Sequence, residues 1–316
     1  MAKTLMVCSG GGHLKQLYTL SSRLGVDPAD QVWVTFENGL SSSLLADREV
    51  HYAPFVAPRD LVNLAKLYSV ARKVMKAHTY DRAFSTGSSP AVAVLPMAAS
   101  SGARTYYIES AARADGPSMT GRILQQLPAV QTYTQYPAWQ SKRWSYAGSI
   151  FDEFVPNAPA VVPSRRVSRA VVTVGTQEGY GFDRLFDALV PLLHDVDEVL
   201  WQVGPQDTSR WGIEGRNRVP HEELCAAMRE ADVVISHAGT GSALTAFEQG
   251  KCPILVPRLA RYREHVDDHQ VQIAREMQRR KLAFMRTPES ITPRTLLNAA
   301  NRAVSTVHPS PMELSA

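Results

Sequence analysis

The sequence has few cysteines, and their spacing excludes two kinds of stabilised small domain. Only Cys8, Cys225 and Cys252 occur in 316 residues, and none belongs to a Cys-x-x-Cys pair. An odd number of widely spaced cysteines indicates neither a disulfide framework nor a structural zinc site. Cys8 lies in an apolar run, so we expect a small core residue there.

Long hydrophobic runs are also lacking. The chain passes from Met1 through the apolar residues 4–8 straight into a run of glycines. That run is too short for the core of a signal peptide, and no other stretch reaches the ~18 apolar residues of a membrane span. We therefore expect a cytoplasmic protein whose membrane contact, where it has one, is peripheral.

The net charge is small, and its distribution is uneven. The formal charge is +4, too weak to predict a nucleic-acid partner. Residues 1–160 carry 15 basic and 11 acidic side chains, whereas residues 161–316 carry 19 of each. The excess favours an anionic partner for the first half, either a phosphate-bearing substrate or an acidic membrane surface. A mildly basic solubilising surface is the alternative.

Strand-like and helix-like segments alternate along the chain. Residues 31–36 are β-branched and aromatic, like a buried strand, and residues 59–78 have the spacing of an amphipathic helix. Such alternation predicts parallel, doubly wound α/β sheets. Residues 151–164 contain three prolines and separate two such patterns. We expect domains at 1–155 and 165–316, with the final helix packing back on the first domain.

The first glycine loop, at residues 9–13, lies between a strand and a helix. Gly10, Gly11 and Gly12 would let a ligand approach the backbone at a helix N-terminus, and His13 could act as a general base. His13 could equally serve only to cap the helix. A dinucleotide-binding motif is disfavoured because Lys15 stands where its third glycine is required.

A second glycine loop, at residues 236–242, follows another apolar strand. Its backbone amides suit a diphosphate, and it lacks the Lys-Ser/Thr of an ATP-binding P-loop. The segment 257–270 that follows the next strand holds three arginines and two histidines. Ligands bind at this edge of parallel sheets, although a solvated connection is the alternative.

Two patterns suggest a metal site but do not complete one. His265 and His269 are four residues apart, yet the HExxH motif is absent. Asp195-Val196-Asp197 has the spacing of a sugar-transferase metal motif but precedes a strand, as a turn would. We predict no metal and no cofactor.

The second half carries motifs that resemble a known family. They are His237–Ser242, Glu248, residues 250–253 and residues 268–270, with residues 172–176 and 182–185 before them. Together they resemble the donor-binding half of glycosyltransferases of the GT-B fold, in the family that contains MurG and the eukaryotic subunit Alg13.

The first half resembles the partner subunit, Alg14. The matching pieces are residues 9–13, residues 85–90, residues 108–110 with Arg113, and residues 118–122. The whole chain thus resembles a fused Alg14–Alg13 glycosyltransferase of the bacterial exopolysaccharide and capsule type. Alg14-like subunits usually begin with a membrane anchor, and this sequence shows none.

The resemblance implies a fold and an activity. The fold would be GT-B, with two Rossmann-like doubly wound domains facing a cleft. The activity would be inverting transfer of a hexose from a UDP-sugar to a polyprenyl-diphosphate-linked sugar. It would take place at the inner face of the cell membrane during synthesis of a cell-surface polysaccharide. Neither a metal nor a nucleic acid would be needed.

The resemblance also implies roles for residues. His13 would be the catalytic base, with Glu109 as the second candidate, and Gly10, Gly11, Gly12 and Arg113 would lie on the acceptor side. The amides of Gly239–Ser242 would hold the diphosphate, and Glu248 the ribose. The full donor set is Gly175, Thr176, Gln177, His237, Gly239, Thr240, Gly241, Ser242, Glu248, Arg258, Asp268, His269 and Gln270.

The helix expected at residues 59–78 bears on membrane contact. Its apolar face would comprise Leu61, Leu64, Tyr68 and Met75, with Arg72, Lys73 and Lys76 adding positive charge. A basic amphipathic helix can lie on an anionic bilayer, but a core helix with solvated lysines has the same sequence pattern.

Three other functions stay open. The chain could be a UDP-sugar epimerase, a soluble transferase that acts on a natural product, or a non-catalytic partner subunit. The presence of both glycine loops in one chain disfavours the last. The hexose is not identified, although Arg258, Arg261 and Arg263 could pair with the carboxylate of a uronic acid.

Overall fold

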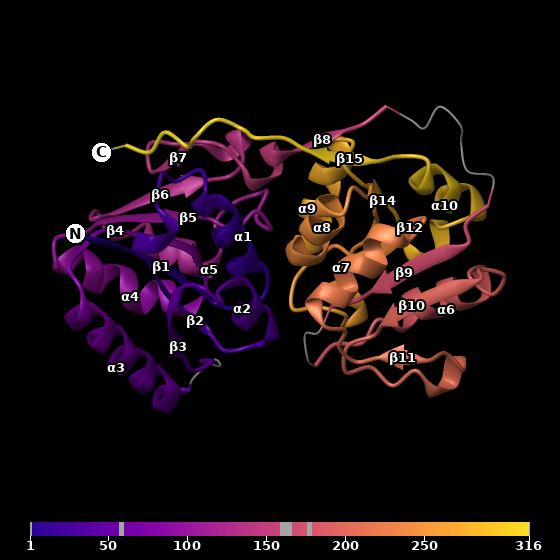
Figure 1. Ribbon diagram of the computed structural model, residues 1–316, viewed down its shortest axis with the longest axis horizontal. Helices are drawn as coiled ribbons and strands as arrows, with labels where there is room; N and C mark the ends of the chain where they lie inside the picture. Colours follow the sequence, from indigo (N-terminus) through magenta and orange to yellow (C-terminus); the bar gives the residue numbers. More distant parts are fainter. Residues whose placement is uncertain (1, 57–59, 159–165, 176–178, 316) are drawn as a thin grey trace. The chain divides into compact units, whose positions relative to one another are not determined.

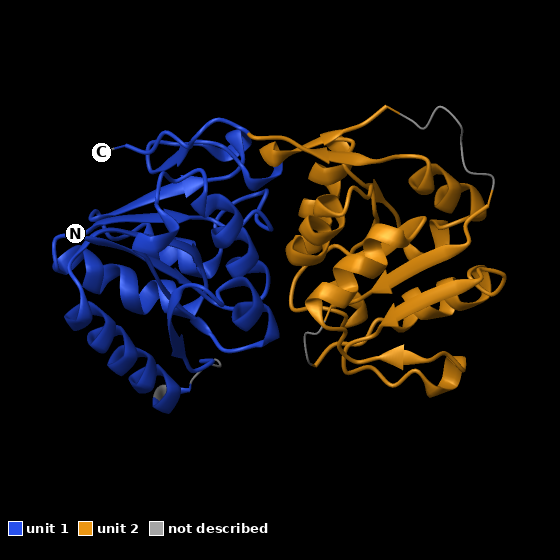
Figure 2. Ribbon diagram, viewed as in Figure 1, with its two compact units in different colours: residues 1–151, 309–316 blue, residues 152–308 orange. Residues whose placement is uncertain are grey.

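The computed structural model describes residues 2–56, 60–158, 166–175 and 179–315. The chain divides into two compact units (Figure 2). Unit 1 comprises residues 1–151 and 309–316, and unit 2 comprises residues 152–308. Each unit is a parallel sheet covered by helices (Figure 1), which confirms the predicted α/β class.

Unit 1 is built on a parallel sheet with strand order β3-β2-β1-β4-β5-β6-β7. The strands are β1 (Lys3–Cys8), β2 (Gln31–Phe36), β3 (Glu49–Ala53), β4 (Tyr80–Gly87), β5 (Arg104–Ile108), β6 (Val130–Thr134) and β7 (Trp144–Tyr146). The helices are α1 (Gly12–Ser21), α2 (Gly39–Leu44), α3 (Leu61–Ala77), α4 (Ser89–Ser100) and α5 (Met119–Leu124).

The centre of this sheet is buried on both faces. Every residue of β2 is buried, as expected for a parallel strand covered by helices on each side. Helix α4 buries Ala91, Val94 and Leu95 against the sheet, and its small side chains allow close packing. The apolar runs recognised in the sequence are therefore the core of unit 1.

Helix α3 buries a face that partly matches the predicted one, since Leu64 and Met75 pack against the core as expected. Leu67, Ala71 and Val74 are fully buried in the core, whereas Tyr68 is 40% exposed. The helix is thus a core-packing element. The side chains of Lys66, Arg72, Lys73 and Lys76 are exposed, and we call these four residues the basic face of α3.

Unit 2 contains a second parallel sheet, with order β11-β10-β9-β12-β13-β14. The strands are β9 (Arg169–Thr173), β10 (Glu198–Gln202), β11 (Gly215–Arg216), β12 (Val233–His237), β13 (Ile254–Val256) and β14 (Phe284–Met285). The helices are α6 (Asp183–Leu192), α7 (His221–Glu230), α8 (Thr240–Glu248), α9 (His269–Arg279) and α10 (Pro293–Ala300). Val172, Phe186, Ile235 and Ile254 lie at the centre of its core.

Two features of the chain path differ from the sequence predictions. The expected linker at 151–164 contains β8 (Phe154–Pro156), which pairs antiparallel with β15 (Val304–Thr306) inside unit 2; residues 159–165 lie outside the described part. The final helix α10 stays in unit 2. The extended residues 309–316 return to unit 1 instead.

The returning segment is held by defined contacts. Met312 is 6% exposed, and its N–H donates to the Arg23 carbonyl at 2.9 Å. The Arg23 Nε donates to the Ser310 carbonyl at 3.2 Å, and the Ser315 N–H donates to the Tyr133 hydroxyl at 2.8 Å. Unit 1 is therefore assembled from both ends of the sequence.

Candidate functional site

Each sheet has one place where its strand order reverses, and the glycine loops lie there. In unit 1, β1 and β4 are neighbours in the sheet. The chain continues from β1 to β2 on one side of this pair and from β4 to β5 on the other. In unit 2, β9 and β12 have the same relationship. Ligands of open parallel sheets bind at such switch points, beside the carboxyl ends of the strands. Each unit therefore offers one such site.

Two glycines of the first loop, Gly10 and Gly11, suit its geometry better than a larger residue would. A Cβ on Gly10 would lie 2.2 Å from Asn38 Nδ2, and Gly11 has a φ of +66°. No described side chain caps the N-terminus of α1. Its amides, at the positive end of the helix dipole, can therefore receive an anionic or hydroxyl-bearing ligand.

His13 is held at the start of α1 by the neighbouring loop. Its Nδ1 lies 2.7 Å from the Thr86 carbonyl oxygen, and the Thr86 hydroxyl donates to the His13 carbonyl at 2.8 Å. A Cβ on Gly87 would lie 3.0 Å from the His13 ring. Because a carbonyl only accepts, Nδ1 carries the proton, and Nε2 is the basic nitrogen of the neutral ring.

Glu109 has the contacts of a positioning carboxylate. It is 1% exposed. Oε1 accepts from the Tyr107 hydroxyl and the Ser110 N–H, both at 3.0 Å, while Oε2 accepts from the Ser118 N–H at 2.8 Å and the Ser118 hydroxyl at 3.1 Å. Burial raises its pKa. Glu109 thus ties the end of β5 to the start of α5, and this placement favours His13 as the base.

Arg113, predicted on the acceptor side, lies on the segment between β5 and α5. Its N–H donates to the Ser110 carbonyl at 2.9 Å, which forms a turn directly after Glu109. The structure therefore places Arg113 beside the Glu109 network.

The second loop surrounds His237. A Cβ on Gly175 would lie 2.9 Å from the His237 ring, and one on Gly239 would lie 2.3 Å from it. Burial, and then the nearby Arg258 guanidinium, lower the pKa of His237 to about 3. His237 is therefore neutral at physiological pH. No described side chain caps α8, which begins at Thr240.

Arg258 is a buried cation at this edge of the sheet. It is 2% exposed and follows β13, and its Nη2 donates to the Val174 carbonyl at 3.0 Å. Its buried Nε has no hydrogen-bond partner among the described residues. Burial lowers the pKa of Arg258 to about 10, so it stays charged at neutral pH. An incompletely paired buried cation beside a helix N-terminus favours an anionic ligand.

The polar segment 257–268 is fixed by contacts that the sequence did not reveal. Arg184 donates to both oxygens of Glu264, at 2.8 and 2.9 Å, and its guanidinium stacks 4.1 Å from the Tyr262 ring centre. Glu264 is only 4% exposed. In the sequence, only the many charged residues of this segment pointed to such ion pairs. The pairing itself could not be predicted, because residues 184 and 264 are distant in sequence.

Three predicted donor residues lie at or near the start of α9. The Asp268 carboxylate accepts from the Ala260 N–H at 2.8 Å, and the Gln270 Oε1 accepts from the Arg258 N–H at 3.0 Å. Gln270 is 3% exposed, so it orders the backbone of Arg258. His269 contacts Asp267, and the sequence analysis did not single out Asp267.

The structure does not bring every predicted donor residue to the α8 N-terminus. Glu248 is the last residue of α8. Eight steps of ~1.5 Å along the helix axis separate its backbone from that of Thr240 by ~12 Å. Its side chain leans toward the N-terminus of the helix, and the ribose lies beyond the diphosphate, so Glu248 stays the predicted ribose ligand. Thr176 and Gln177 lie outside the described residues.

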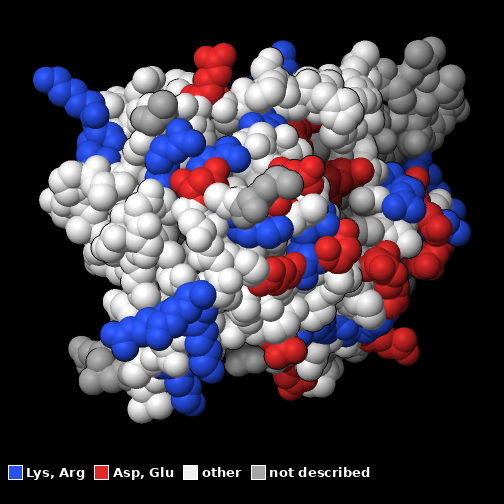
Figure 3. Space-filling view, turned by 60° about the vertical axis from the view of Figure 1, so that its left-hand side comes forward, with Lys and Arg blue, Asp and Glu red and all other residues white. Residues whose placement is uncertain are grey.

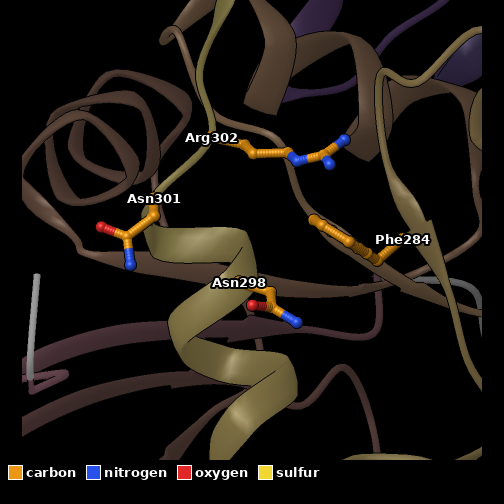
Figure 4. A pocket seen from close by; sticks show the side chains of 4 residues that line it. All are labelled: Phe284, Asn298, Asn301 and Arg302. Atoms are coloured by element: carbon orange, nitrogen blue, oxygen red, sulfur yellow. The ribbon is translucent and has the colours of Figure 1, made fainter. Parts of the chain in front are cut away.

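Unit 2 also has a pocket of about 240 Å³ lined by Phe284, Asn298, Asn301 and Arg302 (Figure 4). The Arg302 guanidinium lies 5.3 Å from the Phe284 ring centre. None of the predicted donor residues lines this pocket. It is therefore separate from the switch-point site.

The second unit matches a known domain. Residues 169–305 match the glycosyltransferase family 28 C-terminal domain. Over 60 residues the chain is 42% identical to the UDP-N-acetylglucosamine transferase subunit ALG13 of Yarrowia lipolytica. That match covers 19% of this chain and 29% of the relative, so the chain spans less than a third of its curated relative.

Solved structures match nearly the whole chain. MurG from Acinetobacter baumannii superposes with a TM-score of 0.58 at 18% identity, covering 94% of this chain and 89% of that chain. The UDP-GlcNAc 2-epimerase from Methanocaldococcus jannaschii gives 0.57 at 10% identity, covering 94% and 91%. At such low identities the likeness shows the fold, which is GT-B.

Proposed function

We propose that this chain, whose second unit is related to the C-terminal domain of family 28 glycosyltransferases, is an inverting glycosyltransferase. It would transfer a hexose from a UDP-sugar to a polyprenyl-diphosphate-linked sugar during synthesis of a cell-surface polysaccharide. The fusion of an Alg14-like and an Alg13-like half and the exopolysaccharide type are parts of this proposal. The observation that carries it is the buried Arg258, which lies close enough to His237 to lower its pKa, because His237 ends the strand that leads into the uncapped α8 N-terminus of the matched domain.

The donor site would use these features without a metal. The amides of Gly239–Ser242 would bind the diphosphate of the UDP-sugar, and Arg258 would face the charge that builds on the departing diphosphate. His237, held neutral, would donate or accept a hydrogen bond rather than contribute charge. His269 would approach the sugar.

His13 would act on the acceptor. Its Nε2 would take the proton from the acceptor hydroxyl as that oxygen forms a bond to the anomeric carbon. The bond from the anomeric carbon to the diphosphate would break with inversion, and UDP would leave. The Thr86 carbonyl would hold the ring in the tautomer that this step needs.

The acceptor implies a membrane surface. Among the described residues no helix has the length and apolarity to cross a bilayer, so we propose peripheral binding at the inner face of the cell membrane. Figure 3 shows a group of Lys and Arg side chains on one part of the surface, at its lower left. The basic face of α3, with Val62 67% exposed beside it, would contact the anionic lipids.

A second candidate function is UDP-sugar epimerisation, because one similar solved structure is named as an epimerase. An epimerase would use cleft carboxylates and would need no acceptor. A soluble natural-product transferase would need neither a lipid acceptor nor a membrane.

The first experiment is a thermal-shift panel of UDP, UDP-glucose, UDP-galactose, UDP-GlcNAc, UDP-glucuronate, GDP-mannose and NAD. A ligand at 100 times its Kd adds about 2.7 kcal/mol, which raises Tm by several degrees. Stabilisation by UDP and one UDP-sugar supports the proposal, and a response to NAD alone would refute it. Product analysis with and without a lipid-linked acceptor then separates transfer from epimerisation.

A further inference from the structure

The side chains of His265, Asp267 and His269 converge where the polar segment 257–268 meets the start of α9. One potential ligand atom from each of His265, Asp267 and His269 lies within 4.8 Å of the other two. From this convergence we infer that these three residues form a binding site for a divalent cation of the zinc class. This inference does not rest on the proposed function: sugar transfer would need no metal, and an ion on His269 Nδ1 would leave Nε2 to approach the sugar.

The geometry centres on one carboxylate oxygen. Asp267 Oδ1 contacts His269 Nδ1 and lies 3.7 Å from His265 Nδ1. The two imidazole rings are edge to face, with centres 4.6 Å apart. Zinc bonds of about 2.0–2.1 Å in a tetrahedron place donor atoms roughly 3.3 Å apart. Small side-chain rotations would therefore bring all three atoms to bonding distance of one ion.

The scaffold around the three residues is ordered. His265 is 8% exposed, and its ring stacks on Tyr180 with centres 5.6 Å apart. The preceding residue, Glu264, is held by the two hydrogen bonds from Arg184. Asp268, between the ligands, accepts from the Ala260 N–H. The ligands thus stand on a segment fixed on both sides, as a preorganised site requires.

The donor set selects the class of ion. Two imidazoles and one carboxylate suit zinc, cobalt or nickel, whereas magnesium and calcium prefer oxygen ligands. Three protein ligands leave one tetrahedral position for water or a phosphate oxygen. Binding would displace the proton shared by His269 Nδ1 and Asp267, so the affinity for the ion would fall as the pH is lowered.

The test is titration of the full-length chain, freed of any histidine tag and of metal, with Co²⁺ followed by visible absorption and with Zn²⁺ followed by calorimetry. We expect one ion per chain. His265→Gln and His269→Gln should each weaken binding by at least about 10–100-fold, the range reported for loss of even an outer partner. Asp267→Asn, which keeps the side-chain shape, should do the same.

A matched control lies in unit 1. Glu49 Oε1 accepts from His51 Nε2 at 3.1 Å and from His78 Nε2 at 2.8 Å, so it has the same residue types. Among the described residues, however, these three are not a group whose ligand atoms all converge as those of His265, Asp267 and His269 do. The double variant His51→Gln with His78→Gln should bind Co²⁺ as the wild type does. Melting curves in chelator would show that each variant is folded.

Three outcomes would overturn the inference. They are no saturable binding by the wild type, binding that survives Asp267→Asn and both histidine substitutions, and binding that is lost in the unit 1 control. The first outcome would mean that Asp267 and His269 form a hydrogen-bonded pair and no metal site. Because the readout is metal binding alone, failure of the proposed glycosyl transfer would not produce any of these results.

Discussion

At the residue scale, one histidine in each proposed site is packed closely against glycines. The His13 ring occupies the space where a Cβ on Gly87 would be, and the His237 ring does the same beside Gly175 and Gly239. These glycines therefore position an imidazole as well as permitting a turn. The sequence showed the glycines and histidines but not their pairing, because each pair joins residues far apart in the chain.

Arg258 can be tested separately from the stability of the fold. Arg258→Met removes the buried charge and keeps much of the volume, but it leaves the Val174 carbonyl without this donor, so we expect a loss of about 1–3 kcal/mol in folding stability. The affinity for UDP should fall about 10- to 100-fold, the value of a hydrogen bond to a charged group. Calorimetry with UDP and melting without ligand measure the two effects.

The exposed Arg261 of the same segment provides the control for Arg258. Arg261→Met should leave UDP affinity unchanged. Equal affinities for UDP in the wild type and the Arg258 variant would show that Arg258 does not face the diphosphate.

His13 and Glu109 should respond differently to substitution. His13→Ala should lower the turnover rate by about 10²- to 10⁴-fold, the contribution of a general base. UDP affinity should not change, because the donor residues lie in unit 2. Turnover is measured as UDP release in the presence of the acceptor.

Glu109→Gln should lower the folding stability rather than the turnover rate. The amide must turn its NH₂ group toward at least one of the donors that now face the carboxylate, so we expect a loss of about 1–3 kcal/mol in folding stability. Turnover per folded molecule should be largely retained. The opposite pattern, with His13→Ala active and Glu109→Gln inactive, would move the base to Glu109.

At the element scale, α3 shows where sequence periodicity falls short. The pattern located the helix to within two residues at its start and one at its end, but it assigned Tyr68 to the apolar face. Small residues such as Ala71 do not mark a buried face by hydrophobicity, yet Ala71 is fully buried. The position of a neighbouring sheet decides which face is covered, and that is a long-range property.

The basic face of α3 yields a prediction about membranes. Reversing Arg72, Lys73 and Lys76 to glutamate should abolish binding to vesicles that contain anionic lipid. Each basic residue near such a surface contributes about 1 kcal/mol, so the three reversals should weaken binding by at least ~100-fold. Co-sedimentation with anionic and neutral vesicles measures it.

A control with the same change of net charge is available in unit 2. Arg218, Arg275 and Arg294 are exposed. Their reversal should leave vesicle binding nearly unchanged, and equal losses in both triple variants would mean that only the total charge matters.

Helix α9 is joined to the first residues of unit 2 by an ionic network. Glu276 accepts from Arg279 at 2.7 Å and from Arg280 at 2.7 Å, and Arg280 also donates to Asp152 at 3.0 Å. Burial acts to raise the pKa of Glu276, but these hydrogen bonds and charges hold it below its ordinary value.

A carboxyl with a lowered pKa stabilises the fold above its unfolded pKa and loses this effect as the pH falls through the folded value. The melting temperature of the wild type should therefore fall more steeply below pH ~4.5 than that of Glu276→Gln. Melting curves between pH 3 and 7 test this, and parallel profiles for the two proteins would contradict it.

At the scale of the whole molecule, the doubly wound architecture could be predicted from sequence, but the connections could not. The alternation of apolar strands and helices depends on residues that are close in sequence. Both sheets and both glycine loops could therefore be predicted from it. The pairing of β8 with β15 and the return of residues 309–316 join segments about 150 residues or more apart, and nothing local marks them.

The returning segment leads to a test by truncation. Removing residues 309–316 exposes the surface that Met312 covers and breaks the hydrogen bonds to Arg23 and Tyr133. Burial of such a side chain contributes about 1.5–3 kcal/mol, so unit 1 should melt several degrees lower. Calorimetry should show the change in unit 1, while UDP binding by unit 2 persists.

Met312→Ala is the milder control and should give part of the same shift. A truncated chain with an unchanged melting profile would show that the segment does not stabilise unit 1.

The same segment constrains the order of events during synthesis. Residues 309–316 leave the ribosome only after all of unit 2 has been translated, so the N-terminal unit cannot reach its complete form while it is the only part made. Unit 2, which is continuous in sequence, has no such dependence. The nascent chain thus carries an unfinished first unit, in which the surface under Met312 is uncovered, until unit 2 has been made.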